Sequence, residues 1–300
     1  MIDSVETYRI RRAFGRVASG FENAAFLHRE IRARLLSRLP IVKIEPDWIM
    51  DLGAGTGAAV QHLAKTFPKA RIVALDFSEE MLAEANPQTD IHAALSDDSP
   101  NEPVTAVCAD AQSLPISDES IDLIFSNLLL QHCTDPLSVL TEARRILRFP
   151  GVFTFSTLGP DSLRELREAW GAADRFSHIA QCMDMHDLGD ALIKAGFAEP
   201  VMYTETLTIT YQSLSRAIAD LRSAGSINAT LDRNRGLTGR QTWQRLTDGY
   251  EQYRKDDGRL AVTVEIIYGL TWSGQPASGT RLPDGEFEIP VDDLRLFSRK

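Results

Sequence analysis

The residues best suited to chemistry form a glycine-rich segment after a short apolar run. This segment is Asp51-Leu52-Gly53-Ala54-Gly55-Thr56-Gly57. Glycines in such a turn let the backbone bend sharply and approach a ligand closely. Dinucleotide enzymes use similar loops, but the later third glycine of their fingerprint is absent here, and an acid stands two residues before the first glycine. We therefore expect this loop to bind a nucleoside other than a dinucleotide.

Two more carboxylates follow the next two predicted strands. Asp76 ends the strand that begins at Arg71, and Asp110 follows the strand 104–109. The carboxyl ends of parallel strands share one edge of a sheet, where Asp76 can accept hydrogen bonds from both ribose hydroxyls. Asp110 is placed to bind an adenine amino group. Because no Lys or Arg occurs from Ile72 to Glu142, this edge suits a cationic nucleoside and does not suit a pyrophosphate.

Alternating strands and helices must position these side chains. Helical periodicity covers the first 38 residues, a run ending at residue 67, and the ranges 79–85, 136–147 and 185–195. Seven segments have the apolar pattern of strands, namely 48–52, 71–75, 104–109, 121–126, 152–156, 201–211 and 260–272. This order predicts an α/β fold with a doubly wound, mostly parallel seven-stranded sheet of the Rossmann-like type.

The same pattern divides the chain into four parts. Residues 1–40 are expected to form a helical segment over the site, and residues 41–211 with 259–273 the core. Residues 212–258 are mainly helical and Arg-rich, and an insertion of this length is better explained as a lid or partner-binding element than as a connection. Residues 274–300 form a tail rich in Gly and Pro.

The composition limits the class of protein. Of 300 residues, 43% are hydrophobic and 25% charged, which is typical of a globular chain with a real core. No run of about 18 apolar residues occurs, and the first residues lack a signal-peptide pattern. Cys108, Cys133 and Cys182 form no CxxC pair, so we expect reduced thiols and no metal site. The prediction is a cytoplasmic protein that does not enter a membrane.

The net charge of −10 is distributed unevenly. Residues 72–142 hold 14 acids and no base, which argues against a nucleic-acid partner. Residues 1–38 hold eight Arg against four acids, and residues 216–259 hold nine bases against six acids. An acidic partner could therefore dock only on these two flanks. A merely solvated charged surface is the alternative.

The glycine loop and its three carboxylates resemble class I S-adenosylmethionine-dependent methyltransferases over about residues 48–156. Further segments extend the resemblance along most of the chain to one subgroup, the malonyl-acyl-carrier-protein O-methyltransferases of biotin synthesis. These segments are Arg12-Ala13-Phe14-Gly15-Arg16, Ser126-Asn127-Leu128-Leu129-Leu130-Gln131, Ser156-Thr157-Leu158-Gly159-Pro160-Asp161, Asp184-Met185-His186-Asp187-Leu188-Gly189-Asp190-Ala191-Leu192 and Gly236-Leu237-Thr238-Gly239.

The resemblance implies a reaction, a cofactor and a partner. Enzymes of this subgroup move a methyl group from S-adenosylmethionine to the free carboxylate of a malonyl group on acyl carrier protein. The resemblance implies that this acidic carrier docks on the basic flanks, where Arg240 and Arg245 are candidates. It also implies a set of cofactor contacts, which are Asp51, Gly53, Gly55, Gly57, Asp76, Phe77, Met81, Asp110, Ala111 and Asn127.

A carboxylate acceptor requires few catalytic groups in the site. It is ionised at neutral pH and needs no general base, so the expected work is positioning and exclusion of water. Its recognition calls for a cation, preferably Arg, or for several donors. The candidates are Arg145, Arg16 and Arg12, with surface pairing to Glu142 or Asp3 as the alternative. His186 either donates to the substrate or caps a helix.

Other residues could act beside the methyl group. Phe14 and Phe21 either pack among the N-terminal helices or close over the methionine end of the cofactor. Asn127 and Gln131 follow the fourth predicted strand, at the edge where the methyl group would be presented.

The chain departs from the subgroup at several positions, and other functions stay open. Phe21 stands where a Tyr is usual, His28 where a Gln is usual, and Leu270 where a His is expected. The turn after Leu147 reads Arg148-Phe149-Pro150-Gly151 in place of Arg-Pro-Gly-Gly. The alternatives are a methyltransferase for another acceptor, such as a quinone, a tRNA or a small acid, and an S-adenosylmethionine-binding protein of the assembly-factor or hydroxylase type that does not methylate.

Overall fold

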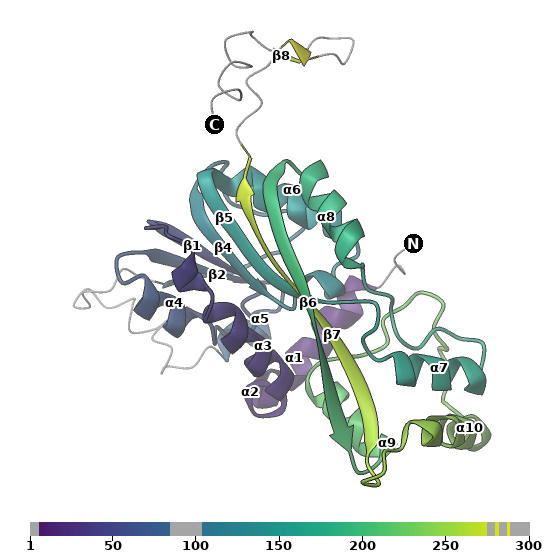
Figure 1. The fold of residues 1–300 in the computed structure, drawn as a ribbon. Coiled ribbons are helices and arrows are strands. Elements are labelled where there is room, and N and C mark those ends of the chain that lie inside the picture. The colour runs from purple at the N-terminus through teal and green to yellow at the C-terminus, as the bar shows by residue number, and fades with distance from the viewer. Residues whose placement is uncertain (1–5, 85–103, 275–279, 282–286, 289–300) are drawn as a thin grey trace.

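A computed structural model of the chain describes residues 6–84, 104–274, 280–281 and 287–288. Nearly all of the predicted tail and the possible pairing of Asp3 lie outside these residues. The described chain forms one seven-stranded sheet with helices on both faces, and a separate pair of two-residue strands, β8 (Thr280–Arg281) and β9 (Phe287–Glu288) (Figure 1).

The seven-stranded sheet is mostly parallel, as predicted. Its order is β3-β2-β1-β4-β5-β7-β6, and β7 runs antiparallel to both of its neighbours. The strands are β1 (Trp48–Leu52), β2 (Arg71–Asp76), β3 (Val104–Cys108), β4 (Ile121–Asn127), β5 (Leu147–Leu158), β6 (Phe197–Tyr211) and β7 (Leu260–Ser273). The chain order reverses between β1 and β4, and at such a reversal the carboxyl ends of the strands leave a crevice for a ligand.

Helices bury apolar side chains against each face. The core on one face takes residues from α3 (Phe26–Leu36), α4 (Val60–Thr66), α7 (Arg164–Ala173), α9 (Leu214–Ser223) and α10 (Arg240–Tyr250). The other core takes residues from α6 (Pro136–Ile146) and α8 (Met185–Lys194). Phe125 and Phe153 are fully buried in these two cores, and burying one such ring contributes about 1.5–3 kcal/mol.

Local sequence explains where several helices begin. The hydroxyl of Ser78 accepts from the Met81 N–H at the start of α5 (Glu79–Ala83). Asp135 accepts from two N–H groups before α6, whose first residue is Pro136, a residue suited to that position. Ser213 caps α9 in the same way.

The N-terminal and inserted helices gather beyond the carboxyl edge of the sheet. The first helices are α1 (Thr7–Val17), η1 (Ala18–Gly20) and α2 (Phe21–Ala24). β6 and β7 extend past the other strands, and α9 and α10 lie at their far end, next to α7 (Figure 1). The helices α9 and α10 therefore interrupt the chain between β6 and β7, where the sequence predicts the insertion.

Most predicted elements are confirmed within a few residues, with three exceptions. The periodicity did not identify α7. The helix after the glycine loop begins only at Val60. The predicted turn after Leu147 is wrong, because residues 148–151 belong to β5, where they supply the extra residues of a register shift between the pairs Ile121–Leu147 and Leu123–Val152.

Candidate functional site

A pocket lies at the carboxyl ends of β1, β2, β3 and β4, and its empty space, including the part open to solvent, is about 930 Å³. Nine of the ten predicted cofactor contacts line it, namely Asp51, Gly53, Gly55, Asp76, Phe77, Met81, Asp110, Ala111 and Asn127. Gly57 is the exception. Its φ of +71° turns the backbone of the loop without placing it in the pocket wall.

Two glycines allow the loop to follow the pocket closely. Gly53 and Gly55 have φ values of +78° and +56°, a region that other residues rarely adopt. A Cβ on Gly53 would lie 3.0 Å from the side chain of Leu129, and one on Gly55 would lie 3.3 Å from Met81. The loop is thus shaped for glycine by both backbone conformation and space.

Asp76 joins this loop to the start of α5. Its two carboxylate oxygens accept from the N–H groups of Gly55 and Ser78, each at 2.9 Å. Burial raises its pKa, and these backbone donors oppose the rise. A carboxylate offers about four acceptor positions, so two stay available to a ligand in the pocket.

Asp51 is the most unusual group in the pocket. It is 2% exposed, and its Oδ2 atom has no hydrogen-bond partner among the described residues. Burial raises its pKa to about 7; the nearby Arg32 lowers it and Asp76 raises it further. A buried, unpartnered carboxylate is costly, so this atom fits a ligand that brings a cationic donor.

Two charged residues of the pocket, Arg32 and Glu22, were not predicted. Arg32 of α3 forms an ion pair with Glu22 at 3.0 Å, and the hydroxyl of Thr56 donates to the same carboxylate at 2.7 Å. Arg32 and Glu22 come from helices that precede the glycine loop by about 20 to 30 residues, so no local spacing indicates them, whereas Thr56 lies within the loop itself.

Four rings form a wall at one side of the pocket. The distances between ring centroids are 5.1 Å from His132, in η5 (Leu130–His132), to Phe14 and 6.1 Å from Phe14 to Phe21. The centroids of Phe21 and His28 are 5.2 Å apart. All four line the pocket. Burial lowers the pKa of His28 to about 4 and that of His132 to about 3, so both imidazoles are neutral at pH 7.

Two further cavities adjoin the pocket behind this wall. The first, of about 690 Å³, shares His28, Leu128 and His132 with the pocket. The second, of about 610 Å³, shares Gln131 and His132 with the first. Their walls are largely apolar and combine the N-terminal helices, β6, β7 and the insertion. This arrangement provides space for a second molecule beside the first.

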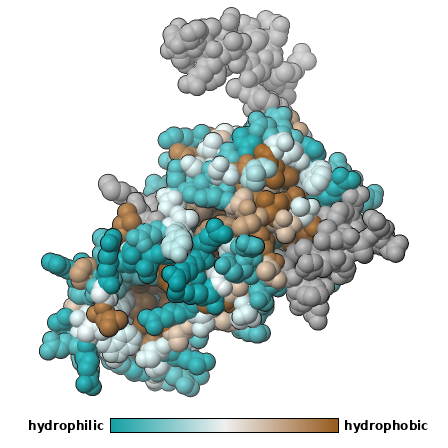
Figure 2. Space-filling view, turned by 180° about the vertical axis from the view of Figure 1, so that it is seen from behind, coloured by the Kyte–Doolittle hydropathy of each residue, from teal (hydrophilic) through white to brown (hydrophobic). Residues whose placement is uncertain are grey.

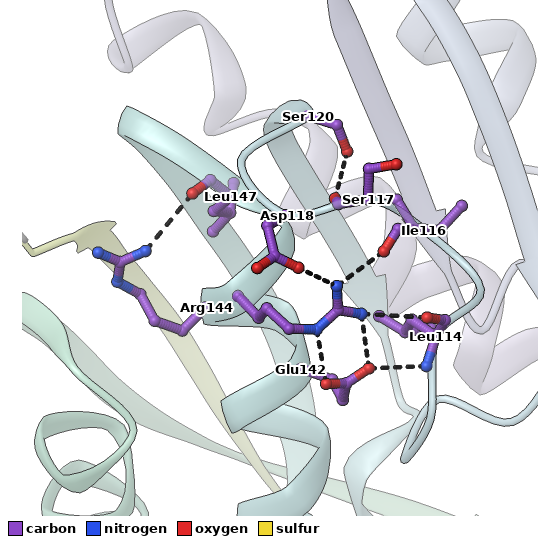
Figure 3. Close-up of polar contacts among 9 residues, drawn as sticks. Leu114, Ile116, Ser117, Asp118, Ser120, Glu142, Arg144 and Leu147 are labelled. Carbon is purple, nitrogen blue, oxygen red and sulfur yellow. Dashed lines mark hydrogen bonds and ion pairs between the residues drawn. The ribbon is translucent and has the colours of Figure 1, made fainter.

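Arg145 does not reach the pocket. Its guanidinium binds Glu142 and Asp118 at 2.8 and 2.6 Å and the carbonyls of Leu114 and Ile116 at 3.0 and 2.8 Å (Figure 3). These contacts use its donors in tying α6 to the loop before β4. The geometry therefore contradicts a role in binding a substrate and favours the alternative of pairing with Glu142.

Arg12, Arg16 and His186 are exposed and line none of the three cavities. The two arginines lie on α1, where they can meet a partner but not a buried carboxylate. His186 stands in the first turn of α8, yet the side chain that caps this helix is Asp184, which accepts from the Asp187 N–H at 2.8 Å.

Asn127 and Gln131 lie near the pocket, as predicted, but support the scaffold. Asn127 donates to the His28 carbonyl at 3.3 Å and accepts from the Ser156 hydroxyl at 2.9 Å. Gln131 donates to the Leu128 carbonyl at 2.8 Å and accepts from Thr157 at 3.0 Å. Both amides are thereby fixed in orientation.

Neither a metal-ligand cluster nor a membrane-spanning helix is found among the described residues. Within the ranges that the structure covers, no three His, Cys, Asp or Glu side chains are grouped as metal ligands would be. No helix in those ranges has the length and apolar character needed to cross a bilayer.

Comparison with known proteins gives two kinds of relative. A family described as "Methyltransferase domain" matches residues 50–155. The malonyl-[acyl-carrier protein] O-methyltransferase of Gallionella capsiferriformans (strain ES-2) is 40% identical over 272 residues, which cover 91% of this chain and 92% of the relative. The protein of that name in Laribacter hongkongensis (strain HLHK9) is 40% identical over 277 residues, covering 92% and 93%.

Solved structures support the fold alone. The YcgJ protein of Bacillus subtilis superposes with a TM-score of 0.57 at 15% identity, covering 81% of this chain and 100% of that one. At such identity the likeness describes the sheet and its helices and does not identify an acceptor.

Proposed function

The chain belongs to the family of malonyl-[acyl-carrier protein] O-methyltransferases, and we propose that it methylates the free carboxylate of a malonyl group carried by acyl carrier protein. The observation that carries the proposal is 40% identity over 91% of this chain, because this span reaches well beyond the domain at residues 50–155. A match of 272 of the 300 residues necessarily takes in the insertion at 212–258, which lines the two adjoining cavities. A place in biotin synthesis and a cytoplasmic location belong to the same proposal.

The pocket offers complementary groups to each part of S-adenosylmethionine, which supplies the methyl group as a reactive sulfonium. Gly53 and Gly55 leave room for close approach of the ligand. Asp76 offers acceptors to the ribose hydroxyls, and Asp110 to the adenine amino group. At the methionine end, the unpartnered oxygen of Asp51 suits the ammonium, and the donors of Arg32 not used by Glu22 suit the carboxylate.

In this reaction the protein positions the methyl donor and the acceptor and shields them from water. The acceptor carboxylate is ionised at neutral pH, so no residue has to remove a proton. Two oppositely charged reactants must meet out of water, since water would stabilise the separated charges more than the neutral ester. The wall of Phe14, Phe21, His28 and His132 excludes water from one side of the pocket.

The surface suits an acidic carrier at one end of the molecule. Arg240 and Arg245 are exposed on α10, and Arg12 and Arg16 are exposed on α1. Hydrophilic side chains dominate the lower left of the view from behind, the part to which α7, α9 and α10 belong (Figure 2). We infer that the carrier docks there, because the acidic residues 72–142 belong mainly to the opposite half of the sheet order.

The proposal is tested by the mass of the carrier after reaction. Malonyl-acyl carrier protein should gain one methyl group when incubated with the protein and S-adenosylmethionine. Acetyl-acyl carrier protein, which has no free carboxylate, is the matched control and should gain none. Equal methylation of both carriers, or of neither, would contradict the proposal.

A further inference from the structure

His132 lines the cofactor pocket and both adjoining cavities. Among the described residues, no other polar or charged residue lines all three. His28 lines the pocket and the first cavity. The two imidazoles therefore stand where a methyl donor in the pocket would face an acceptor in the cavities.

The adjoining cavities contain no cation to bind an acceptor's carboxylate. Among the described residues that line them, the one charged side chain is Asp220, and the rest are apolar or neutral. The amides of Asn127 and Gln131 are engaged with backbone carbonyls and hydroxyls. Arg167 lies behind Ser162, whose carbonyl it binds at 2.9 Å, and lines neither cavity.

The two histidines, in contrast, have free hydrogen-bonding capacity. The Nδ1 atom of His28 is buried without a partner, and within the described residues neither ring makes a side-chain hydrogen bond. Each neutral imidazole carries one N–H donor. A buried polar atom without a partner destabilises the protein unless a ligand satisfies it, so the Nδ1 atom of His28 fits a ligand that forms a hydrogen bond there. His132 lines the same junction, where its N–H can reach the same ligand.

We propose that His132 and His28 bind the acceptor's carboxylate at this junction as neutral N–H donors and so direct one oxygen toward the methyl group. This proposal rests on the proposed function, because it assumes an acceptor with a free carboxylate. It replaces the arginine expected from the sequence with uncharged groups.

Neutral donors suit the reaction better than an arginine would. The carboxylate loses its negative charge as the methyl group is transferred, so a cation paired with it would stabilise the reactant more than the transition state. A neutral N–H also fixes the position of the oxygen, but it stabilises the reactant carboxylate over the transition state less than a cation does. The burial that lowers the pKa of both histidines keeps them uncharged before the acceptor binds.

The test compares variants of His132 with a matched control. His132→Phe keeps an aromatic ring but removes both nitrogens, and His132→Asn keeps a donor. His62→Phe makes the same change at an exposed histidine on α4. The kinetic constants for malonyl-acyl carrier protein, the Kd for S-adenosylmethionine and the Kd for malonyl- against acetyl-acyl carrier protein are measured for each.

We expect His132→Phe to lower kcat/KM by about 10- to 100-fold, the range for loss of a hydrogen bond to a charged group. The Kd for S-adenosylmethionine should change less than about threefold, and the preference for malonyl- over acetyl-acyl carrier protein should disappear. His132→Asn should recover part of the loss. His28→Gln, which keeps a donor, should retain more activity than His28→Phe.

Several results would overturn the inference. One is wild-type kinetics and preference in both His132→Phe and His28→Phe. Another is loss of the carboxylate preference in Arg167→Lys while both histidine variants keep it. Absence of transfer by the wild-type protein would overturn the proposed function and the inference together, whereas normal wild-type transfer with unaffected variants would overturn the inference alone.

Discussion

The buried carboxyl of Asp51 links cofactor binding to pH. Burial raises its pKa to about 7, against a lowering by Arg32 and a further rise from Asp76. The ammonium of the cofactor favours the ionised form, so binding below pH 7 must first remove a proton. Affinity should therefore rise with pH up to about 7.5, after which the α-amino group of the cofactor begins to lose its own proton.

The expected change is measured by titration calorimetry. The Kd for S-adenosylmethionine should fall about fivefold to tenfold between pH 6 and 7.5, as the ionised fraction of Asp51 rises. Asp51→Asn should bind more weakly and lose most of this dependence. If the variant showed the same pH slope as the wild type, the slope would have to come from another group.

Arg145 illustrates how a side chain suited to a substrate can serve the fold. It binds two acids and two carbonyls that hold α6 against the loop before β4 (Figure 3). Removing it leaves the half-buried Glu142 without its main partner. Arg145→Met should therefore lower the free energy of unfolding by about 2 kcal/mol, measured by urea denaturation. Its KM for the acceptor should stay within about twofold of wild type, and a large rise would restore Arg145 as a substrate residue.

Among individual residues, the sequence predicts the site residues that lie next to a predicted strand. Asp51 lies near the end of a predicted strand, and Asp76 and Asp110 each follow one, so their convergence could be inferred from the parallel sheet. Arg32 and His132 could not be found in this way. Arg32 precedes the glycine loop on a helix, and the role of His132 depends on cavities that form only when the insertion packs on the N-terminal helices.

Among the elements, α1 is held over the pocket by the insertion. Arg233, whose side chain is 9% exposed, pairs with Glu6 at 3.0 Å. The Glu6 N–H donates to the Ala229 carbonyl at 2.8 Å. Gly225 packs so closely on Phe14 that a Cβ there would lie 2.7 Å from the ring. The insertion therefore reaches the cofactor pocket through α1.

Loosening this contact should release the cofactor faster. Arg233→Met removes the ion pair at the start of α1, and we expect the Kd for S-adenosylmethionine to rise about 3- to 30-fold, since breaking a shielded pair costs more than a surface one. Stopped-flow dissociation should show the change mainly in the off-rate. Arg235→Met is the matched control, because Arg235 is an exposed neighbour. Equal off-rates in both variants would show that this contact does not retain the cofactor.

The elements were predictable where apolar periodicity is strong and local. All seven strands follow from such patterns. The cap of α8 was not predicted, because it is Asp184 and not the candidate His186. α7 was missed because its buried residues include Glu165, an acid whose carboxylate binds the Thr263 backbone N–H at 3.0 Å. A buried Glu whose carboxylate is hydrogen-bonded counts as a polar residue in the sequence, so it interrupts the apolar periodicity of the buried face of α7.

For the whole molecule, charge separates the two ends. Residues 72–142 carry acids and no base, while α10 carries the exposed Arg240 and Arg245. Reversing both to Glu should raise KM for malonyl-acyl carrier protein about tenfold and leave the Kd for S-adenosylmethionine unchanged, with an effect that shrinks at high salt. Steady-state kinetics at two salt concentrations measure it.

Two exposed lysines provide the control for this reversal. Lys65 and Lys69 lie in and just after α4, so Lys65→Glu with Lys69→Glu makes the same change in net charge elsewhere. This double variant should keep a wild-type KM. A similar rise in both double variants would indicate a general effect of net charge and contradict docking on α10.

The alternation of strands and helices was enough to predict the sheet and its mostly parallel character. It was not enough to place β7 between β5 and β6, because antiparallel insertion of a last strand depends on pairing between segments about 50 residues apart. The first adjoining cavity follows from this placement, since β6 and β7 both line it, whereas the second is lined by α1 and the insertion. Their position is a property of the assembled molecule.

The most direct test of carboxyl methylation follows a labelled methyl group from S-adenosylmethionine. Malonyl-acyl carrier protein, malonyl-CoA and free malonate are offered separately at equal concentration. We expect label on the carrier form that mild base removes, as is typical of a methyl ester, with less label on malonyl-CoA and least on malonate. Label that resists base, or no label on the carrier while S-adenosylmethionine still binds, would contradict carboxyl methylation as the function.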